Sequence, residues 1–333
     1  MMKTAIVIIN YNGLNLIKKF MPSIIINSSD YNIYVIDNNS TDDSVNYIKN
    51  NFSNINIINN SSNLGYAGGY NEGIKEIDED LLIFLNNDAT FLDENSLSNL
   101  VKVFKENSEI KVAQPKIIDF TNQEKFEYSG AAGGFIDFFG YPFCRGRIFS
   151  NVELKNNYNT TREVFWASGT CFAVRRSTFI EHNGFDESFF AHMEEIDLCW
   201  RIKRKNIDDK IVAVGNSEVH HLGGGSLTYN SSNKYYLNFR NSIIMMIKNI
   251  PGKYFFQFLL GRLFLDFLIL IFSIISLKFN LFIGIVKAYL FLLINFLKIK
   301  RVKFKNERIF KYYYCKSIIF DYLFRRKNKF SKI

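Results

Sequence analysis

The first third of the chain alternates short apolar runs with polar turns and helix-like segments. The apolar runs have the length of strands and cover residues 5–9, 33–36, 55–58 and 81–85. Alternation of this kind predicts an α/β fold in which helices cover a mainly parallel central sheet. Ligands of such sheets bind beyond the carboxyl ends of the strands. The residues that follow each apolar run are therefore the first candidates for a functional site.

Oxygen-rich side chains follow three of these four runs. They are Asn10 and Asn12 after the first run, Asp37 and Asn39 after the second, and Asn87 and Asp88 after the fourth. A carboxylate at a strand end can accept hydrogen bonds from a base or a ribose, and it can equally be a helix N-cap. Both interpretations of Asp37 stay open. Asp88 could bind a divalent cation, because Mg²⁺ and Mn²⁺ prefer oxygen ligands, or it could be a simple cap.

A glycine-rich segment follows the third run. Asn63, Gly65 and Asn71 belong to Asn-Leu-Gly-Tyr-Ala-Gly-Gly-Tyr-Asn at 63–71. Glycines at the start of a helix let the phosphates of a ligand approach the backbone. The pattern is not GxGxxG and does not follow the first run, so a dinucleotide-binding fingerprint fits poorly. A tight turn between strand and helix explains the segment equally well.

Residues 114–167 are less regular and contain two glycine-rich stretches, 130–134 and 141–147. A long loop-rich insertion in a compact domain is usually functional. We expect contacts with a second substrate in this region and near Trp166, Gly169 and Phe190.

Three arginines are candidate contacts to phosphates. Arg145 and Arg147 lie in the glycine-rich insertion, and Arg240 lies in the segment Asn-Phe-Arg-Asn at 238–241. The planar guanidinium group suits bidentate binding of phosphate. A structural role for each of them is equally open.

An acidic helix is predicted within residues 189–201. It carries Glu194, Glu195 and Asp197 in a largely apolar stretch. Neighbouring carboxylates raise one another's pKa, which suits a general base. The alternative is a structural cluster in which these acids pair with the following basic residues. Further along, His221 precedes three glycines and is a candidate metal ligand, although His220 beside it makes the choice ambiguous.

The last part of the chain is apolar and then basic. Residues 255–297 are dominated by Phe, Leu and Ile, but their longest uncharged run, 267–277, is shorter than the roughly 20 residues that span a bilayer. This pattern favours a helical hairpin in the membrane interface. A helical lid packed on a soluble domain is the alternative.

The net charge of +9 is concentrated at the end of the chain. Residues 298–332 contain 13 Lys or Arg and 2 acids, a net charge of +11, which leaves −2 for the rest. A basic tail after hydrophobic helices suits an anionic membrane surface, and we expect no nucleic-acid partner. The four cysteines form no CxxC pair, which favours a reducing, cytoplasmic setting. We therefore expect a cytoplasmic protein that is peripherally associated with the membrane.

Taken in order, these segments resemble the bacterial family 2 glycosyltransferases, particularly the rhamnosyltransferase-like branch. The matching stretches are 7–13, 35–42, 63–71, 85–88, 166–169, 184–190, 194–201, 221–226 and 238–241. Each is weak alone, but the ordered set is specific. The resemblance implies a GT-A nucleotide-binding domain, which we place at 1–245, followed by a helical membrane-associating region at 246–333.

The resemblance also implies roles for the candidate residues. Asp37 would hold the nucleoside of the donor, with further nucleotide contacts expected from Asn10, Asn12, Asn39, Asn63, Gly65, Asn71 and Asn87. Asp88 and His221 would ligate Mg²⁺ or Mn²⁺, and Glu195 would be the general base, with Glu194 as its competitor and Asp197 beside them. Two positions depart from the family pattern. Asn86 and Asn87 stand where an acid often precedes Asp88, and Glu194-Glu195 replaces the usual Glu-Asp.

The expected reaction is an inverting transfer from a TDP- or UDP-linked sugar, with rhamnose as a candidate, to a hydroxyl of a glycan or lipid-linked acceptor. Such a reaction would serve the assembly of a surface polysaccharide. The rival hypotheses are another nucleotide-dependent transferase, an α/β dinucleotide enzyme, and an inactive membrane-tethered module that binds sugar nucleotides.

Overall fold

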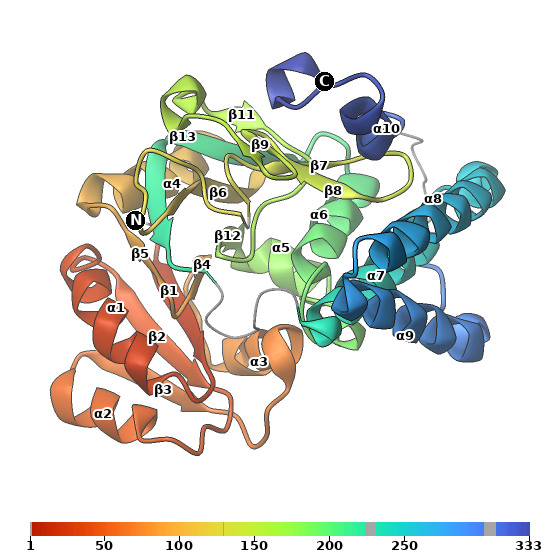
Figure 1. The fold of residues 1–333 in the computed structure, drawn as a ribbon. Coiled ribbons are helices and arrows are strands. Elements are labelled where there is room, and N and C mark those ends of the chain that lie inside the picture. The colour runs from red at the N-terminus through yellow and green to blue at the C-terminus, as the bar shows by residue number, and fades with distance from the viewer. Residues whose placement is uncertain (1, 129, 224–230, 303–310) are drawn as a thin grey trace.

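The computed structural model describes residues 2–128, 130–223, 231–302 and 311–333. Its centre is a nine-stranded mixed sheet in the order β11-β13-β6-β12-β4-β1-β2-β3, with β5 paired to β13 (Figure 1). Gly224 and Gly225, which follow His221 in the predicted motif, lie outside the described residues.

One half of this sheet is parallel, as predicted. Its strands are β1 (Thr4–Asn10), β2 (Asn32–Asp37), β3 (Ile55–Asn59) and β4 (Leu81–Asn86). Apolar side chains fill both faces of β1, because a sheet covered on both sides buries every residue of a central strand. The register pairs Asn10 with Asp37 and Ile9 with Asn86, so three strand ends meet at one edge.

The other half mixes strand directions. Its strands are β5 (Ala89–Phe91), β6 (Ile110–Asp119), β11 (Arg162–Glu163), β12 (Cys171–Arg175) and β13 (Lys210–His221). β13 runs parallel to β6, and β12 is antiparallel to both β4 and β6. β13 ends at His221, which pairs with Ala89 directly after Asp88.

The insertion, expected to be irregular, contains a second sheet of four short strands in the order β10-β9-β8-β7. These are β7 (Gly134–Ile136), β8 (Pro142–Cys144), β9 (Arg147–Ile148) and β10 (Asn151–Val152). Strands of two or three residues are too short to produce a recognisable alternation in the sequence, which is why the pattern missed them.

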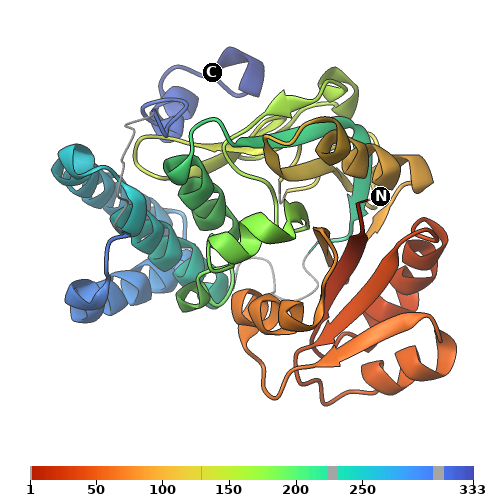
Figure 2. The same cartoon turned by 180° about the vertical axis from the view of Figure 1, so that it is seen from behind.

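Helices cover both faces of the large sheet (Figures 1 and 2). One apolar core joins the sheet to α1 (Leu14–Ile26), α2 (Ser44–Asn51) and α4 (Glu94–Glu106). The other joins it to α3 (Gly65–Gly73), α5 (Arg176–Glu181), α6 (Glu194–Lys205) and α7 (Ser232–Asn249). Short 3-10 helices lie at Ile74–Glu76, Lys155–Tyr158, Glu187–Phe189, Gly252–Tyr254, Phe296–Lys298 and Phe330–Lys332.

The C-terminal hairpin consists of α8 (Phe255–Ile275) and α9 (Phe279–Asn295) and is followed by α10 (Ile318–Leu323). It lies at the end of the molecule opposite α1 and α2 (Figures 1 and 2). By length and composition alone, Gly252–Ile275 and Phe279–Lys298 could each cross a membrane. Phe258, Leu292 and Tyr312 nevertheless pack into the same core as α6 and α7. The boundary at residue 245 stays a prediction.

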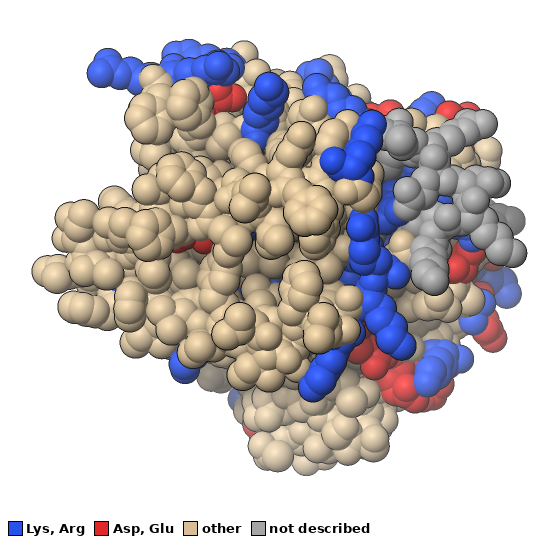
Figure 3. All heavy atoms as spheres, turned by 90° about the vertical axis from the view of Figure 1, so that its right-hand side faces the viewer, with Lys and Arg blue, Asp and Glu red and all other residues tan. Residues whose placement is uncertain are grey.

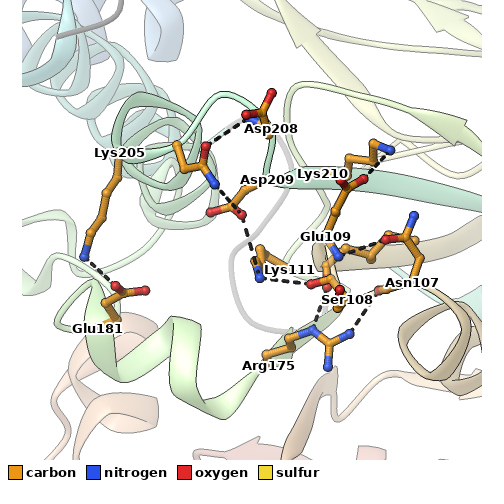
Figure 4. Close-up of polar contacts among 12 residues, drawn as sticks. Asn107, Ser108, Glu109, Lys111, Arg175, Glu181, Lys205, Asp208, Asp209 and Lys210 are labelled. Carbon is orange, nitrogen blue, oxygen red and sulfur yellow. Dashed lines mark hydrogen bonds and ion pairs between the residues drawn. The ribbon is translucent and has the colours of Figure 1, made fainter. Parts of the chain in front are cut away.

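A network of polar contacts closes the sheet edge where β6 and β13 begin (Figure 4). Arg175 donates from Nε to the carbonyl of Ile110 and from Nη2 to the carbonyls of Phe104 and Asn107. Lys210 pairs with Glu109 at 2.6 Å. Because β6 and β13 are parallel, this edge lies opposite the one at which His221 ends β13.

Candidate functional site

The ends of β1, β2 and β4 are joined by amide and carboxylate side chains. Asn10 is fully buried and donates from Nδ2 to Asp37 Oδ1 at 3.2 Å. Asn87 in turn donates to Asn10 Oδ1 at 3.3 Å. The structure thus brings these three predicted residues together at the carboxyl edge of the sheet.

Asp37 closes the turn after β2 and does not cap a helix. Its Oδ2 accepts the backbone N–H of Ser40 at 2.8 Å, whereas α2 begins only at Ser44. Asn12 links the same turn to the end of β1, because its Oδ1 accepts the N–H of Thr41 at 2.7 Å. Asn12 and Asn39 both adopt positive φ, a conformation that asparagine tolerates better than most residues.

The start of α3 is occupied by the chain itself. The carbonyl of Phe190 accepts the N–H groups of Tyr66 and Ala67, which are groups that a phosphate could otherwise use. Gly65 permits this approach, since its φ is +72° and a Cβ would lie 2.6 Å from that carbonyl oxygen. Asn63 accepts the N–H of Gly65 at 3.0 Å.

Asn71 also contacts the protein. Its side chain donates to the carbonyl of Phe185 and accepts the N–H of the same residue. Direct contacts of Asn63, Gly65 and Asn71 with a nucleotide stay predictions.

Asp88 and His221 form a buried pair. The register between β13 and β5 brings them together, and His221 Nε2 lies 3.0 Å from Asp88 Oδ1. On the other side of the ring, Nδ1 lies 3.2 Å from Glu127 Oε2. Burial lowers the pKa of His221, but hydrogen bonds to Asp88 and Glu127 and their charges outweigh it and raise this pKa to about 9.

Glu127 is a site residue that sequence reasoning missed. It is buried, and it lies in the insertion, in a loop with no motif around it. A metal-binding histidine usually donates its second ring N–H to a carboxylate, which fixes the ring orientation. The position of Glu127 matches that arrangement, and only the three-dimensional fold reveals it.

The positions of Asp88 and His221 fit two ligands of a divalent cation whose other ligands come from a substrate. Adjacent ligands of an octahedral ion with bonds of about 2.1 Å lie about 3.0 Å apart. The observed separation of Nε2 and Oδ1 is 3.0 Å. Within the described part of the chain, no three His, Cys, Asp or Glu side chains form a metal cage. Further ligands would therefore come from phosphate and water.

Two carboxylates with unsatisfied oxygens lie at the start of α6. Within the described residues, Glu194 Oε2 and Glu195 Oε2 are buried and have no hydrogen-bond partner. Burial raises the pKa of Glu195 to about 7. Burial and the charge of Glu195 hold the pKa of Glu194 well above its usual range. A carboxylate with one unpaired oxygen and a pKa raised to about 7 can take up a proton near neutral pH.

Glu195 faces the loop before β12. A Cβ on Gly169 would lie 3.9 Å from the carboxyl carbon of Glu195 and 3.1 Å from the hydroxyl of Tyr66. Tyr66 donates to the carbonyl of Gly169 at 2.7 Å. The next residue in this loop, Thr170, accepts the N–H of Asn86 at 3.0 Å. One short loop thus connects the neighbourhood of Glu195 with the strand end that carries Asp88.

Asp197 joins α6 to α7. It is fully buried, and its carboxylate accepts from Arg201 Nε and from Asn249 Nδ2, both at 2.6 Å. These contacts match the structural alternative for the acidic helix, in which an acid pairs with a following basic residue. The catalytic role of Asp197 is untested.

The three candidate arginines lie in different surroundings. Arg240 donates from Nη2 to the carbonyls of Ser188 and Phe189, so part of its guanidinium holds the loop before α6. Arg147 donates to the carbonyl of Phe149 at 2.7 Å. Arg145 is buried, and its Nη1 has no hydrogen-bond partner among the residues that the structure describes. Phosphate binding by these residues stays a prediction.

The candidate acceptor residues differ in exposure. Trp166 is buried and donates from Nε1 to the carbonyl of Phe135 at 3.0 Å, so it packs against the small sheet of the insertion. Phe190 is 47% exposed and adopts a positive φ of 63°. Phe190 is therefore better placed than Trp166 to meet a second substrate.

A family model described as "Glycosyl transferase family 2" matches residues 5–182. The chain is 25% identical over 248 residues to "Low-salt glycan biosynthesis hexosyltransferase Agl10" of Haloferax volcanii, covering 72% of this chain and 74% of that one. It is 26% identical over 210 residues to "Rhamnosyltransferase WbbL" of Escherichia coli K12, covering 59% and 75%.

A solved structure shows the same fold. The crystal structure of GalNAc-T7 with UDP, GalNAc and Mn²⁺ superposes with a TM-score of 0.56 at 19% identity. The match covers 74% of this chain and spans about half (48%) of that protein. The expected GT-A type of nucleotide-binding fold is thereby confirmed.

Proposed function

The chain belongs to glycosyl transferase family 2, and from this premise we propose that it is an inverting glycosyltransferase using a TDP- or UDP-linked sugar, with rhamnose as a candidate. The acceptor would be a hydroxyl of a glycan or a lipid-linked sugar in surface polysaccharide assembly. The names of two relatives, a glycan-biosynthesis hexosyltransferase and a rhamnosyltransferase, support this direction.

The carboxyl edge of the parallel strands would bind the donor. Asp37 and Asn10 support this assignment, because their buried side chains meet where ligands of such sheets bind. Asp88 and His221 would hold Mg²⁺ or Mn²⁺. When bound, such an ion supplies positive charge that stabilises a departing nucleoside diphosphate.

Glu195 would be the general base. Its carboxylate would remove the proton of the acceptor hydroxyl as the hydroxyl oxygen attacks the anomeric carbon and the bond to the diphosphate breaks. The observation that carries this proposal is the unpaired, buried Oε2 of Glu195, on a carboxyl group whose pKa burial raises to about 7. Glu194 remains the competing base.

The test compares Glu195→Gln with Glu194→Gln. We expect Glu195→Gln to reduce sugar transfer at least about 100-fold, the lower range for loss of a general base. Binding of the nucleotide should stay unchanged, as measured by the thermal shift with UDP or TDP and Mn²⁺. Near-normal turnover of Glu195→Gln, or a larger loss in Glu194→Gln, would overturn the assignment.

The same experiment separates the proposal from its main rival. An inactive module that binds sugar nucleotides predicts donor binding by the wild-type chain without transfer to any acceptor and without hydrolysis. We place the enzyme on the cytoplasmic side of a membrane, peripherally bound, because a lipid-linked acceptor resides there. The apolar C-terminal hairpin supports this placement.

A further inference from the structure

The C-terminal hairpin carries exposed apolar side chains along its whole length. On α8 they recur every three or four residues, at Phe256, Leu260, Phe264, Phe267, Ile271 and Ile275. This spacing places them on one face of the helix. Phe256 and Ile275, near the two ends of α8, are each 76% exposed, so the exposed apolar face extends over the full length of the helix.

The opposite face of α8 is polar and buried. Arg262, Asp266 and Ser273 are each at most 2% exposed, with Phe258 as an apolar neighbour at one end. A surface helix of a water-soluble protein normally turns its apolar stripe inward and its charges outward. In α8 this order is reversed. The outer face is therefore suited to an apolar environment, and a contiguous apolar surface of this kind marks an interaction site.

The buried polar residues attach the middle of α8 to the catalytic domain. Arg262 donates to the carbonyl of Phe139 at 3.1 Å and to Ser242 of α7 at 2.8 Å. Asp266 accepts from the hydroxyls of Tyr141 and, at 2.6 Å, Tyr289 of α9. Arg262 and Asp266 also pair with each other at 2.8 Å. We call these contacts the Arg262 cluster.

The position of the Arg262 cluster determines how α8 can meet a bilayer. A helix that crosses a membrane has its midpoint at the centre of the hydrocarbon. The midpoint of α8 contacts the loop at 137–141, and a Cβ on Gly261 would lie 2.1 Å from the ring of Phe139. A crossing helix would therefore carry this irregular loop into the hydrocarbon, where loop backbone is not tolerated against lipid. Only an orientation along the membrane surface avoids this.

The charges around the hairpin match an anionic surface. Between residues 251 and 306 Asp266 is the only acid, and it is buried and paired. Among the described residues of this part, 251–302, the exposed basic residues are Lys253, Lys278, Lys287, Lys298, Lys300 and Arg301. Figure 3 shows a broad face with few charged side chains, lined on one side by Lys and Arg. Lysine and arginine beside a membrane each add attraction to anionic lipids.

We propose that the outer face of the C-terminal hairpin lies flat on an anionic lipid bilayer and that the Arg262 cluster holds α8 in the required rotation. The apolar side chains of α8 and α9 would enter the interface, and neither helix would cross the membrane. The inference rests on the proposed function in one respect: a lipid-linked acceptor would require the enzyme to act at a membrane surface.

The hairpin is also connected to the loop before the proposed base. Arg240 of α7 places its guanidinium 5.2 Å from the ring of Phe291 of α9 while it donates to the carbonyls of Ser188 and Phe189. Asn241 donates to the carbonyls of Ala191 and His192 in the same loop. Docking of the hairpin would thus orient the loop that carries Phe190 relative to the bilayer, from which a lipid-linked acceptor arrives.

The first test is co-sedimentation of the full-length chain with vesicles of phosphatidylcholine and phosphatidylglycerol. The triple variant Leu260→Gln, Phe264→Gln and Phe267→Gln changes only exposed side chains of the outer face. We expect its vesicle binding to fall at least tenfold while its circular dichroism stays unchanged. The matched control, Ile26→Gln, Leu92→Gln and Ile180→Gln, changes three exposed apolar residues elsewhere and should bind as the wild type does.

The second test measures how deeply two positions of α8 enter the bilayer. Single cysteines at Leu260 and Ile274, in a Cys315→Ser background, carry a fluorophore that is quenched by lipids brominated at known depths. The two positions are 14 residues apart, about 21 Å along a helix. Flat docking predicts equal, shallow depths for both and release of the chain from vesicles by alkaline carbonate.

Three results would overturn the proposal. The first is wild-type binding by the outer-face variant, or equal binding to vesicles without phosphatidylglycerol. The second is a depth difference of about 20 Å together with resistance to carbonate, which indicates a crossing helix. The third is self-association that covers this face and abolishes vesicle binding. None of these measurements involves donor or transfer, so they are independent of the proposed reaction.

Discussion

Glu127 and Asp88 contact opposite sides of the His221 ring. With a metal bound, a carboxylate at Nδ1 would hold a proton on that nitrogen while Nε2, having lost its own proton, donates an electron pair to the ion. Under the proposed metal site, this contact would orient the ring so that Nε2 faces Asp88 and the cation. A residue in a loop without any sequence motif thus contacts a candidate ligand that is distant in the sequence.

Replacing Glu127 should weaken metal binding although it leaves both proposed ligands, Asp88 and His221, unchanged. We expect Glu127→Ala to lower the affinity for Mn²⁺ about 10- to 100-fold, the usual effect of losing such a partner. Glu127→Gln, which can still accept from Nδ1, should lose less. Mn²⁺-dependent thermal shifts in the presence of UDP measure this effect. Glu124→Ala, an exposed neighbour, is the control; an unchanged Mn²⁺ affinity in Glu127→Ala would contradict the role.

The raised pKa of Glu195 predicts how transfer depends on pH. The carboxylate is the active form of a base, and burial raises the pKa of Glu195 to about 7. Activity should therefore be lost as the pH falls through about 7 and reach a plateau above it. The measurement is kcat/KM for the nucleotide sugar between pH 5 and 9. A flat profile over this range would speak against Glu195 as the base.

At the scale of elements, α6 is held by contacts of very different strength. Asp197 is buried, pairs with Arg201 within α6, and joins α6 to α7 by accepting from Asn249. At the far end of the helix, Lys205 pairs with Glu181 in solvent (Figure 4), with side chains 47% and 55% exposed. A buried ion pair that loses one partner leaves an uncompensated charge, whereas an exposed pair is screened by water.

The two pairs should respond differently to mutation. Asp197→Ala should lower the free energy of unfolding by about 3–5 kcal/mol. Lys205→Ala should change it by less than about 1 kcal/mol. Urea unfolding followed by circular dichroism compares them. Equal effects of the two variants would refute a structural role for Asp197 as the connection between α6 and α7.

At the scale of the whole molecule, the C-terminal part is attached to the GT-A domain by shared packing. Phe258 of α8, Leu292 of α9 and Tyr312 enter the core that also contains α6 and α7. Tyr312 stacks on the buried ring of Trp200 with centroids 4.9 Å apart. The inner face of the hairpin thus packs on the domain, whereas the apolar side chains of its outer face are exposed.

Removal of this part should therefore destabilise the remaining domain. A chain that ends at Asn249 loses the burial of at least three large side chains, each contributing about 1.5–3 kcal/mol. We expect a melting temperature several degrees lower, measured by thermal unfolding in mild detergent with the full chain as the reference. Identical melting curves would show that the domain does not depend on its C-terminal part.

The sequence by itself determined the parallel half of the sheet and the residues at its carboxyl edge. Four apolar runs of strand length predicted β1 to β4, because the period and length of a buried strand are local properties. Asn10 and Asp37 are the last residues of β1 and β2, and Asn87 comes directly after β4. Parallel pairing of these strands is enough to bring the three side chains to one edge.

The family resemblance implied that Asp88 and His221 meet at one metal ion, but only the tertiary structure shows how distant residues come together. The register between β13 and β5 brings His221 to Asp88, and a loop of the insertion adds Glu127. Pairing across more than a hundred residues leaves no local pattern, because it depends on how strands of separate segments align. The same holds for α8, where composition shows an apolar helix but only packing reveals that its charges, Arg262 and Asp266, face inward.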